Sequence, residues 1–271
     1  MEAFATRYGP WAVVVGAAQG IGAEFCRRLA ARKLHLIMVA LEDEELRELA
    51  RDLEREQGIQ TKVIVGDITS PDVMARLDEA AGESEAGMLV CNAALSSTAA
   101  WLDTSLERHL AMVDVNVRAP LTLIDRFVRP MAARGRGGLI LLSSMSALQG
   151  SPMVATYAAT KAFTLNLAES LWDEFRPAGV DVLAVVPGPT DTPGYRASAP
   201  RPTRFTPKPM SVEPVVAEAL EALGSRPWIV PGRANSILGF VLSRILPRRA
   251  AIRFMGRTMR SMYGGARGAK R

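Results

Sequence analysis

The sequence predicts an α/β protein with one doubly wound, mostly parallel sheet that carries helices on both faces. Short apolar runs alternate with amphipathic, helix-like segments along most of the 271 residues, a pattern typical of a parallel sheet covered on both sides. The runs are rich in Val, Ile and Leu and are apolar on both faces, as buried strands are. Seven such runs occur, and we expect seven strands, at Ala12–Val15, Leu34–Val39, Lys62–Val65, Met88–Cys91, Leu139–Leu142, Val180–Val186 and Trp228–Val230.

The connecting segments support a single domain over residues 1–232. Glu44–Gln57 has the clearest helix pattern, with three leucines on one face and charges on the other. The first 232 residues contain no linker and no internal repeat. Residues 188–211 break the alternation because they are rich in proline and have little periodicity. We predict a long loop there.

Residues 233–271 are predicted to form a basic, helical C-terminal extension. From Arg226 onward there are 11 Lys and Arg and no Asp or Glu, whereas the preceding residues hold 22 basic and 28 acidic groups. Arg248–Tyr263 has the pattern of an amphipathic helix, which could pack on a partner subunit, lie on an anionic membrane surface or promote solubility. Its apolar arc contains Ile252, Met255, Met259 and Met262, and its basic face contains Arg249, Arg253, Arg257 and Arg260.

The composition argues against several classes of protein. Two cysteines, Cys26 and Cys91, cannot form a disulfide scaffold and suit a reducing compartment. Two histidines, His35 and His109, stand far apart and form no zinc-ligand pattern, so we expect no metal. The first residues lack the apolar core of a signal peptide, and no apolar run reaches the ~20 residues of a membrane span. We therefore expect a cytoplasmic protein.

A glycine-rich turn follows the first predicted strand. It reads Gly16-Ala-Ala-Gln-Gly20-Ile-Gly22 and directly precedes the helix-like segment Ala23–Ala31. Glycines in such a turn let the backbone approach a pyrophosphate, and the helix N-terminus then faces the phosphate charge. The turn predicts a Rossmann-type dinucleotide site, although a tight strand-to-helix turn is the alternative.

A second group of residues has the chemistry of proton transfer. Tyr157 and Lys161 are spaced to share one helix face, and a nearby ammonium favours a phenolate. Such a pair is common on helix surfaces by chance. Ser143 and Ser144, however, follow the predicted strand Leu139–Leu142, and ligands of open α/β sheets bind at the carboxyl ends of strands. A serine there could hold a substrate oxygen, or it could only cap a turn.

Taken together, the motifs resemble the short-chain dehydrogenase/reductase family in the expected order from Tyr8 to Val230. The glycine turn matches T-G-x-x-x-G-x-G except that Val15 replaces the threonine, and Ser144 stands thirteen residues before Tyr157, the usual interval. The other matching segments are Gly66-Asp-Ile68, Leu89-Val-Cys-Asn-Ala-Ala94, Asp114-Val-Asn116-Val and Pro187-Gly-Pro-Thr-Asp-Thr192. Cys91 and Ala94 depart from the N-N-A-G pattern of the second segment.

The resemblance implies an enzyme that interconverts a secondary alcohol and a ketone and so acts on CH–OH groups. It assigns Tyr157 as general acid and base, Lys161 as its electrostatic partner and ribose ligand, Ser144 as the group that orients the substrate oxygen, and Asn116 as the holder of a relay water. It implies cofactor contacts at Gly16, Ala18, Gln19, Gly20, Ile21, Gly22, Leu41, Glu42, Asp67, Ile68, Asn92, Ala93, Ala94, Tyr157, Lys161, Pro187, Gly188, Thr190 and Thr192.

The sequence favours NAD(H) over NADP(H). Relatives that prefer NADP(H) usually carry an arginine just after the second strand, whereas this chain has Leu41 and Glu42 there and Gln19 in the glycine turn. A carboxylate accepts hydrogen bonds from ribose hydroxyls and repels a 2′-phosphate.

The sequence defines the substrate and the partners less narrowly than the reaction. By resemblance, the loop at 188–211 covers the substrate, and the protein forms a homodimer or homotetramer. Similarity to bacterial ketosteroid and 3-oxoacyl reductases favours an apolar substrate that is steroid-like, lipid-like or a 3-oxoacyl group. Arg196, Arg201, Arg204 and Lys208 could meet an anionic substrate or simply be solvated. Alternatives are a catalytically silent nucleotide-binding scaffold and peripheral membrane contact through the C-terminal helix; nucleic-acid binding is not expected because no aromatic platform accompanies the arginines.

Overall fold

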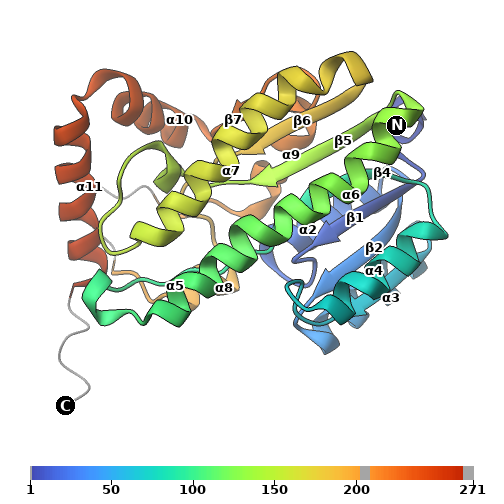
Figure 1. The fold of residues 1–271 in the computed structure, drawn as a ribbon, viewed down its shortest axis with the longest axis horizontal. Helices are drawn as coiled ribbons and strands as arrows, with labels where there is room; N and C mark the ends of the chain where they lie inside the picture. Colours follow the sequence, from blue (N-terminus) through green and yellow to red (C-terminus); the bar gives the residue numbers. More distant parts are fainter. Residues whose placement is uncertain (1, 202–207, 265–271) are drawn as a thin grey trace.

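The computed structural model describes residues 2–201 and 208–264, and its centre is a sheet of seven parallel strands (Figure 1). The strand order is β3-β2-β1-β4-β5-β6-β7, so the chain winds outward in both directions from the pair β1 and β4. The predicted doubly wound sheet is confirmed, and every predicted strand end lies within two residues of the observed one. The strands are β1 (Trp11–Val15), β2 (His35–Ala40), β3 (Thr61–Val65), β4 (Ala86–Cys91), β5 (Gly137–Leu142), β6 (Val180–Val185) and β7 (Trp228–Ile229).

Helices cover both faces of this sheet. The α-helices are α1 (Glu2–Tyr8), α2 (Gly20–Ala30), α3 (Asp43–Gln57), α4 (Pro71–Gly82), α5 (Leu106–Val113), α6 (Ala119–Arg134), α7 (Ala155–Glu174), α8 (Pro193–Ala197), α9 (Val212–Ala222), α10 (Arg233–Phe240) and α11 (Arg248–Tyr263). Short 3-10 turns lie at η1 (Trp101–Asp103), η3 (Met145–Leu148) and η4 (Arg176–Ala178), and π turns at η2 (Asp114–Arg118) and η5 (Val241–Ile245). No helix in the described part of the chain is long and apolar enough to cross a membrane.

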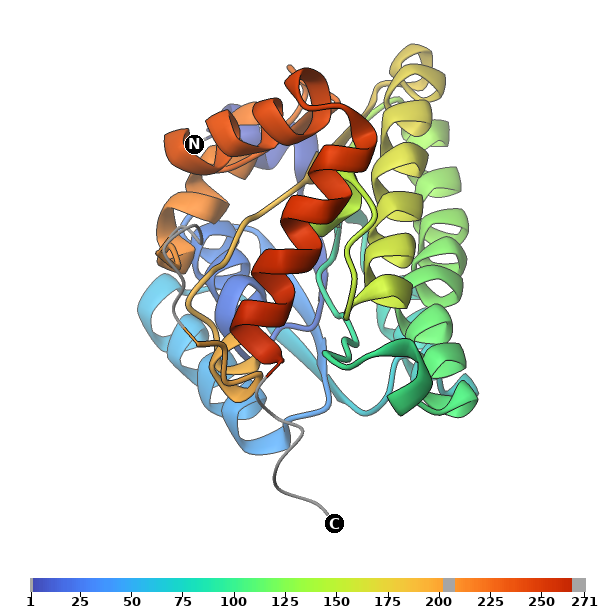
Figure 2. The same cartoon turned by 90° about the vertical axis from the view of Figure 1, so that its left-hand side faces the viewer.

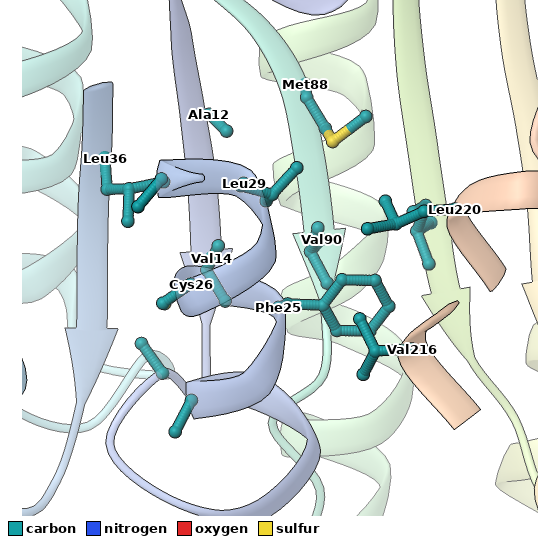
Figure 3. Packing of buried hydrophobic residues seen from close by; sticks show 14 of the residues in the cluster. Ala12, Val14, Phe25, Cys26, Leu29, Leu36, Met88, Val90, Val216 and Leu220 are labelled. Atoms are coloured by element: carbon teal, nitrogen blue, oxygen red, sulfur yellow. The ribbon is translucent and has the colours of Figure 1, made fainter. Parts of the chain in front are cut away.

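The core has two layers, one on each face of the sheet, because side chains alternate along each strand. Val14 belongs to the layer that packs on α2, α3 and α9, whereas its neighbour Val13 belongs to the layer under α4, α6 and α7. Figure 3 shows Phe25 of α2 beside Val216 of α9, and Leu29 of the same helix near Met88 of β4. Burial on both faces explains why the strands are apolar throughout.

The segment predicted as a long loop contains one short helix. Thr192 caps α8 by accepting a hydrogen bond from the Tyr195 backbone N–H at 3.1 Å, and Pro193 occupies the first turn. The segment returns beside its own start, where Thr190 and Met210 form a parallel bridge. Residues 202–207, which include Arg204, lie outside the described residues.

The C-terminal helices α10 and α11 lie at the end of the sheet toward which the strands point. In Figure 1 the arrowheads of the central strands face α11, and in Figure 2 α11 runs across the front of the molecule. The C-terminal extension therefore stands over the carboxyl ends of the strands, where open α/β sheets bind their ligands.

Candidate active site

A cavity of about 850 Å³ lies at the carboxyl ends of the strands, between the glycine turn and α11. It lies at the point where the strand order reverses, as expected for a doubly wound sheet. Most of the residues predicted for the site line it: Gly16, Gln19, Gly20, Ile21, Leu41, Glu42, Asp67, Ile68, Asn92, Ala93, Ala94, Ser144, Tyr157, Lys161, Pro187, Gly188, Thr190 and Thr192.

Three predicted site residues, Ala18, Gly22 and Asn116, do not line the cavity. Ala18 is buried in the core layer under α2. Gly22 packs so tightly against the glycine turn that an added Cβ would lie 1.8 Å from the Gly16 carbonyl oxygen. The third glycine therefore sets the distance between the turn and helix α2 and is not expected to touch a ligand directly.

The glycine turn has the shape and the free donors that a pyrophosphate needs. Gly16 has φ +82°, and a Cβ there would lie 2.7 Å from the Ala93 nitrogen, so only glycine fits. Gln19 caps α2 without a side-chain hydrogen bond, and the first turn of α2 has no acidic residue. The Gly16 and Ala17 N–H groups donate to the Val39 carbonyl, at 2.7 and 3.1 Å, so the N–H groups at the start of α2 are the ones that can hold an anion. This fits the phosphates of a dinucleotide.

The replacement of threonine by Val15 does not separate β1 from the segment after β4. The backbone N–H groups of Asn92 and Ala93 both donate to the Val15 carbonyl, at 3.0 and 2.8 Å. The Asn92 side-chain amide also donates to the Gly16 carbonyl at 2.8 Å. Main-chain bonds and Asn92 thus hold the two segments together without the hydroxyl.

Tyr157, Lys161 and Ser144 converge on the cavity from helix α7 and the end of β5. Lys161 is buried, and its Nζ donates to the Leu142 carbonyl at 2.7 Å and lies 5.7 Å from the centre of the Tyr157 ring. The two serines after β5 have different surroundings. The Ser143 hydroxyl donates a hydrogen bond to the Lys161 carbonyl at 2.7 Å. The Ser144 hydroxyl instead accepts a hydrogen bond from Ser146 Oγ at 3.0 Å. Ser144 therefore retains its own proton to donate.

Burial dominates the ionisation of the tyrosine and the lysine. It raises the pKa of Tyr157, and hydrogen bonding to Ser144 opposes the shift only in part. Burial also lowers the pKa of Lys161 to about 8. Burial, and not the ammonium, is thus the largest influence on the Tyr157 pKa in this structure.

Asn116 sits in the π turn η2 behind the cavity. Its Nδ2 donates to the Leu95 carbonyl at 2.8 Å and to Thr160 Oγ1 at 3.0 Å, and its Oδ1 accepts from the Leu95 N–H at 2.8 Å. It therefore fastens the segment after β4 to α7, the helix of Tyr157. π turns are often found at functional sites because they redirect one side chain out of the helical pattern.

The other wall of the cavity was missed in the sequence. Side chains of the C-terminal extension line it, namely Leu238, Leu242, Phe254, Met255, Thr258, Met259, Met262 and Tyr263. The predicted apolar arc of α11 is real, but most of it faces the cavity of its own chain instead of a partner subunit or a membrane. The helical spacing of the methionines could be recognised in the sequence. The surface against which they pack could not be predicted from it.

The cover, by which we mean α8 together with α10, η5 and α11, has polar contacts to its neighbours at several described residues. Arg248 of α11 donates to the Leu148 carbonyl at 2.8 Å. Ser198 Oγ and Tyr263 OH lie 3.3 Å apart, and the Arg201 N–H donates to the Met262 carbonyl at 3.1 Å.

The predicted loop does border the cavity, through Pro193, Tyr195 and Ser198, but its described basic side chains do not line it. Arg196 pairs with Asp191 at 2.6 Å, and Arg201 and Lys208 are exposed. The described part of this loop thus gives a solvated basic surface.

Comparison with known proteins agrees with this geometry. The family model described as short chain dehydrogenase matches residues 10–202. A 7beta-hydroxysteroid dehydrogenase of Mediterraneibacter gnavus is 33% identical over 84% of this chain and 88% of its own length. The solved structure of a study on 7beta-hydroxysteroid dehydrogenase stereoselectivity is 30% identical, with a TM-score of 0.86 over 93% of this chain and 98% of that chain.

A further solved structure holds a cofactor. The short-chain dehydrogenase from Sphingobium yanoikuyae in complex with NADPH is 28% identical, with a TM-score of 0.73 over 82% of this chain and 87% of that chain. The family model, the relatives and the fold agree with one another. The chain belongs to the short-chain dehydrogenase/reductase family and is an NAD(P)-dependent oxidoreductase that acts on CH–OH groups.

Proposed function

We propose that this enzyme interconverts a bulky, apolar ketone and its secondary alcohol, with a steroid-like molecule as the substrate class. The observation that carries the proposal is the wall opposite Tyr157, where Leu, Phe and Met side chains of α10, η5 and α11 line the cavity. Apolar walls with a few polar groups at one end are typical of sites that bind and orient large apolar ligands. The name of the relatives that are 33% identical supports the same class.

Tyr157, Ser144 and Lys161 would carry the proton chemistry. A bound nicotinamide cofactor, held by the glycine turn and by Pro187–Thr192, supplies or accepts the hydride. In the reductive direction the Tyr157 hydroxyl donates its proton to the substrate oxygen, and the Ser144 hydroxyl donates a hydrogen bond to that oxygen. Lys161, whose pKa is lowered to about 8, can exchange a proton with its surroundings near neutral pH.

Asn116 would connect Lys161 to solvent through a water. Both hydrogens of its Nδ2 are used on protein acceptors, but its Oδ1 accepts only one hydrogen bond among those described. An amide oxygen has two lone pairs, so one remains for a water. The Asn116 amide also fixes the start of α7. Its substitution is therefore expected to disturb both the position of Tyr157 and the proton relay.

A substrate panel tests the proposed function. Steroid ketones, a 3-oxoacyl thioester and acetone are each offered with NADH and with NADPH, and cofactor oxidation is followed at 340 nm. We expect turnover with the steroid ketones and a much lower kcat/KM with acetone. Turnover of the thioester alone would replace the steroid-like class by an acyl class. Cofactor binding without turnover of any compound would favour the silent scaffold.

The cofactor preference is proposed to be NAD(H). Leu41, at 67% exposure, and Glu42 line the cavity just after β2, and neither can pair with a 2′-phosphate. The comparison of kcat/KM for the two cofactors tests this, and Glu42→Arg should shift the ratio toward NADPH. Glu44→Arg, two residues later in the first turn of α3 and outside the cavity, is the matched control. A preference of the unaltered enzyme for NADPH, the cofactor bound in the Sphingobium relative, would contradict the proposal.

Self-association is proposed through an exposed apolar face on α5, α6 and α7. Acidic and basic side chains are interspersed there, for example in the pair of Asp125 and Arg129 at 2.5 Å, so two copies can meet face to face without net repulsion. Light scattering should give the molar mass of a dimer or tetramer. Leu110→Glu should shift the association equilibrium toward the monomer. The exposed residues are Leu106, Leu110, Val113, Leu121 and Phe163.

We also propose a cytoplasmic location, which suits the free buried thiols of Cys26 and Cys91, with peripheral contact to anionic membranes. Because α11 turns its methionines inward, α10 and η5 are the better surface for such contact: Ile237, Phe240 and Ile245 are 67, 58 and 63% exposed. Co-sedimentation with anionic but not neutral vesicles, weakened in Phe240→Ser, is the expected result. Equal sedimentation of both proteins would remove the membrane contact.

A further inference from the structure

A second cavity, of about 590 Å³, lies beside the catalytic one. The segment after β4 forms part of the wall between them: Ser96 and Thr98 line the catalytic cavity, whereas Ser97 and Ala99 line the second. Val154 lines both. Neither the proposed reaction nor the cofactor uses this second cavity.

His109 gives the second cavity a buried donor without an acceptor. Its side chain is 9% exposed, and its Nδ1 lies 2.7 Å from Thr156 Oγ1. Its Nε2 is buried and has no hydrogen-bond partner among the residues that the structure describes. Buried polar atoms are nearly always hydrogen-bonded, so an unpaired ring nitrogen in a cavity wall indicates an absent partner. If the Thr156 hydroxyl donates to Nδ1, Nε2 carries the proton and needs an acceptor.

Arg260 places a positive charge in the same cavity. Its guanidinium lies over Gly256 next to Pro152, each within 3.3 Å of the position of a Cβ on that glycine. Within residues 2–201 and 208–264 Arg260 forms no ion pair, and no Asp or Glu lines the cavity. Arg260 is exposed, has no carboxylate partner among the described residues and lines the same cavity as His109, so it is suited to bind an anion there.

The remaining wall is apolar and partly strained. The ring of Trp101 stacks on His109, with centroids 4.0 Å apart, and Met112 and Met153 lie around them. Met153 has φ +68°, a left-handed conformation that is rare for a residue with a side chain and is found most often at functional sites. The Ala99 N–H holds this conformation by donating to the Met153 carbonyl at 2.9 Å.

We infer that the second cavity binds a monocarboxylate with a short apolar chain. The carboxylate accepts a hydrogen bond from His109 Nε2 and pairs with the guanidinium of Arg260, while the chain lies against Trp101, Met112 and Met153. The site is distinct from the catalytic cavity, and its occupant contacts Ala155 and Thr156, the residues just before Tyr157. Binding at this site does not depend on the proposed function, since it is measured without turnover.

The chain allows a direct test because it contains only two histidines. Octanoate is titrated into the enzyme while the imidazole nitrogens of His109 and His35 are followed by long-range ¹H–¹⁵N NMR. We expect saturable shifts of the His109 signals and none of His35, which lies against Trp11 and accepts from the Gln60 N–H at 3.0 Å. Octanamide, which lacks the charge, should shift His109 at least ten-fold more weakly.

Three variants separate this cavity from the catalytic one. Arg260→Gln should weaken octanoate binding at least ten-fold. Arg257→Gln, one turn earlier, should not change it, because Arg257 is exposed like Arg260 but does not line the cavity. Met255→Trp, which narrows only the catalytic cavity, should leave it unchanged. Loss of binding in Met255→Trp but not in Arg260→Gln, or equal shifts of both histidines, would overturn the inference.

Discussion

The two walls of the catalytic cavity are built in different ways. On the cofactor side the main chain forms the wall: the glycine turn, the ends of the strands and the segment Pro187–Thr192 approach closely, and Gly16 and Gly22 leave no space for a Cβ. On the cover side, methionine, leucine and aromatic side chains form the wall, and the described polar contacts between α8 and α11 are few.

This difference implies a division of labour. Close main-chain contacts tolerate little displacement, so the cofactor side fixes the geometry of the reaction. Methionine side chains are flexible and fill irregular spaces, so the cover can adjust to the shape of a substrate. Substitutions on the first side should therefore change cofactor binding or the chemical step, and those on the cover should change which substrate is accepted.

The largest effect is expected for Tyr157→Phe. Loss of the proton donor should lower kcat by about 10²–10⁴-fold, while the dissociation constant of NADH, measured by fluorescence, changes little. Tyr263→Phe is the matched control, because it removes a hydroxyl from the cover near Ser198 and should change kcat by less than about three-fold. A comparable loss of kcat in both variants would contradict the proposed difference between the two walls.

Gly22→Ala is expected to weaken cofactor binding by about ten-fold or more. The new methyl group would meet the Gly16 carbonyl oxygen at 1.8 Å, so the turn and α2 must separate. Gly82→Ala, where no atom lies within 4 Å of the added carbon, is the control. Calorimetric titration with NADH measures both, and unchanged affinity in Gly22→Ala would show that the turn is less constrained than its contacts suggest.

Lys161 should make the stability of the fold depend on pH. Its pKa is about 8 in the folded protein and near 10.5 when unfolded, so between these values the unfolded chain binds more protons. The free energy of unfolding should therefore rise with pH from about 8 to 10.5, by up to about 3 kcal/mol.

Lys161→Met removes this contribution together with the coupling between Lys161 and the Cys91 thiol. The buried thiols, whose pKa values are raised, act in the opposite direction, and only that of Cys26 is expected to contribute equally in both proteins. Urea unfolding at pH 7, 8, 9 and 10 measures the difference. Parallel curves would mean that Lys161 titrates normally in the folded state.

The smallest effect is expected for Met259→Ala in the cover. Removing this side chain widens the cavity on the side away from the cofactor, so KM for a bulky ketone should rise several-fold while KM for NADH stays the same. Arg257→Ala, on the exposed face of α11, is the control. A change in kcat as large as that of Tyr157→Phe would place Met259 within the reacting geometry.

The two walls also differ in how well the sequence predicts them. Gly16, Ser144, Tyr157 and Lys161 could be found because strand, turn and helix are consecutive in the chain, and local spacing decides where their side chains lie. Met255, Met259 and Met262 could not, because an amphipathic pattern defines an apolar face but not the surface that covers it. The burial that raises the Tyr157 pKa could not be predicted either, since it depends on residues distant in sequence.

The position of α10, η5 and α11 outside the family-matched stretch has a consequence for how this enzyme can change. The residues proposed for the chemistry all lie within residues 10–202, whereas the side chains that these three helical segments contribute to the cavity lie beyond them. Exchange of residues 233–264 between relatives is therefore expected to change selectivity while the catalytic residues are kept. The boundary near Gly232 is a natural crossover point for such chimaeras.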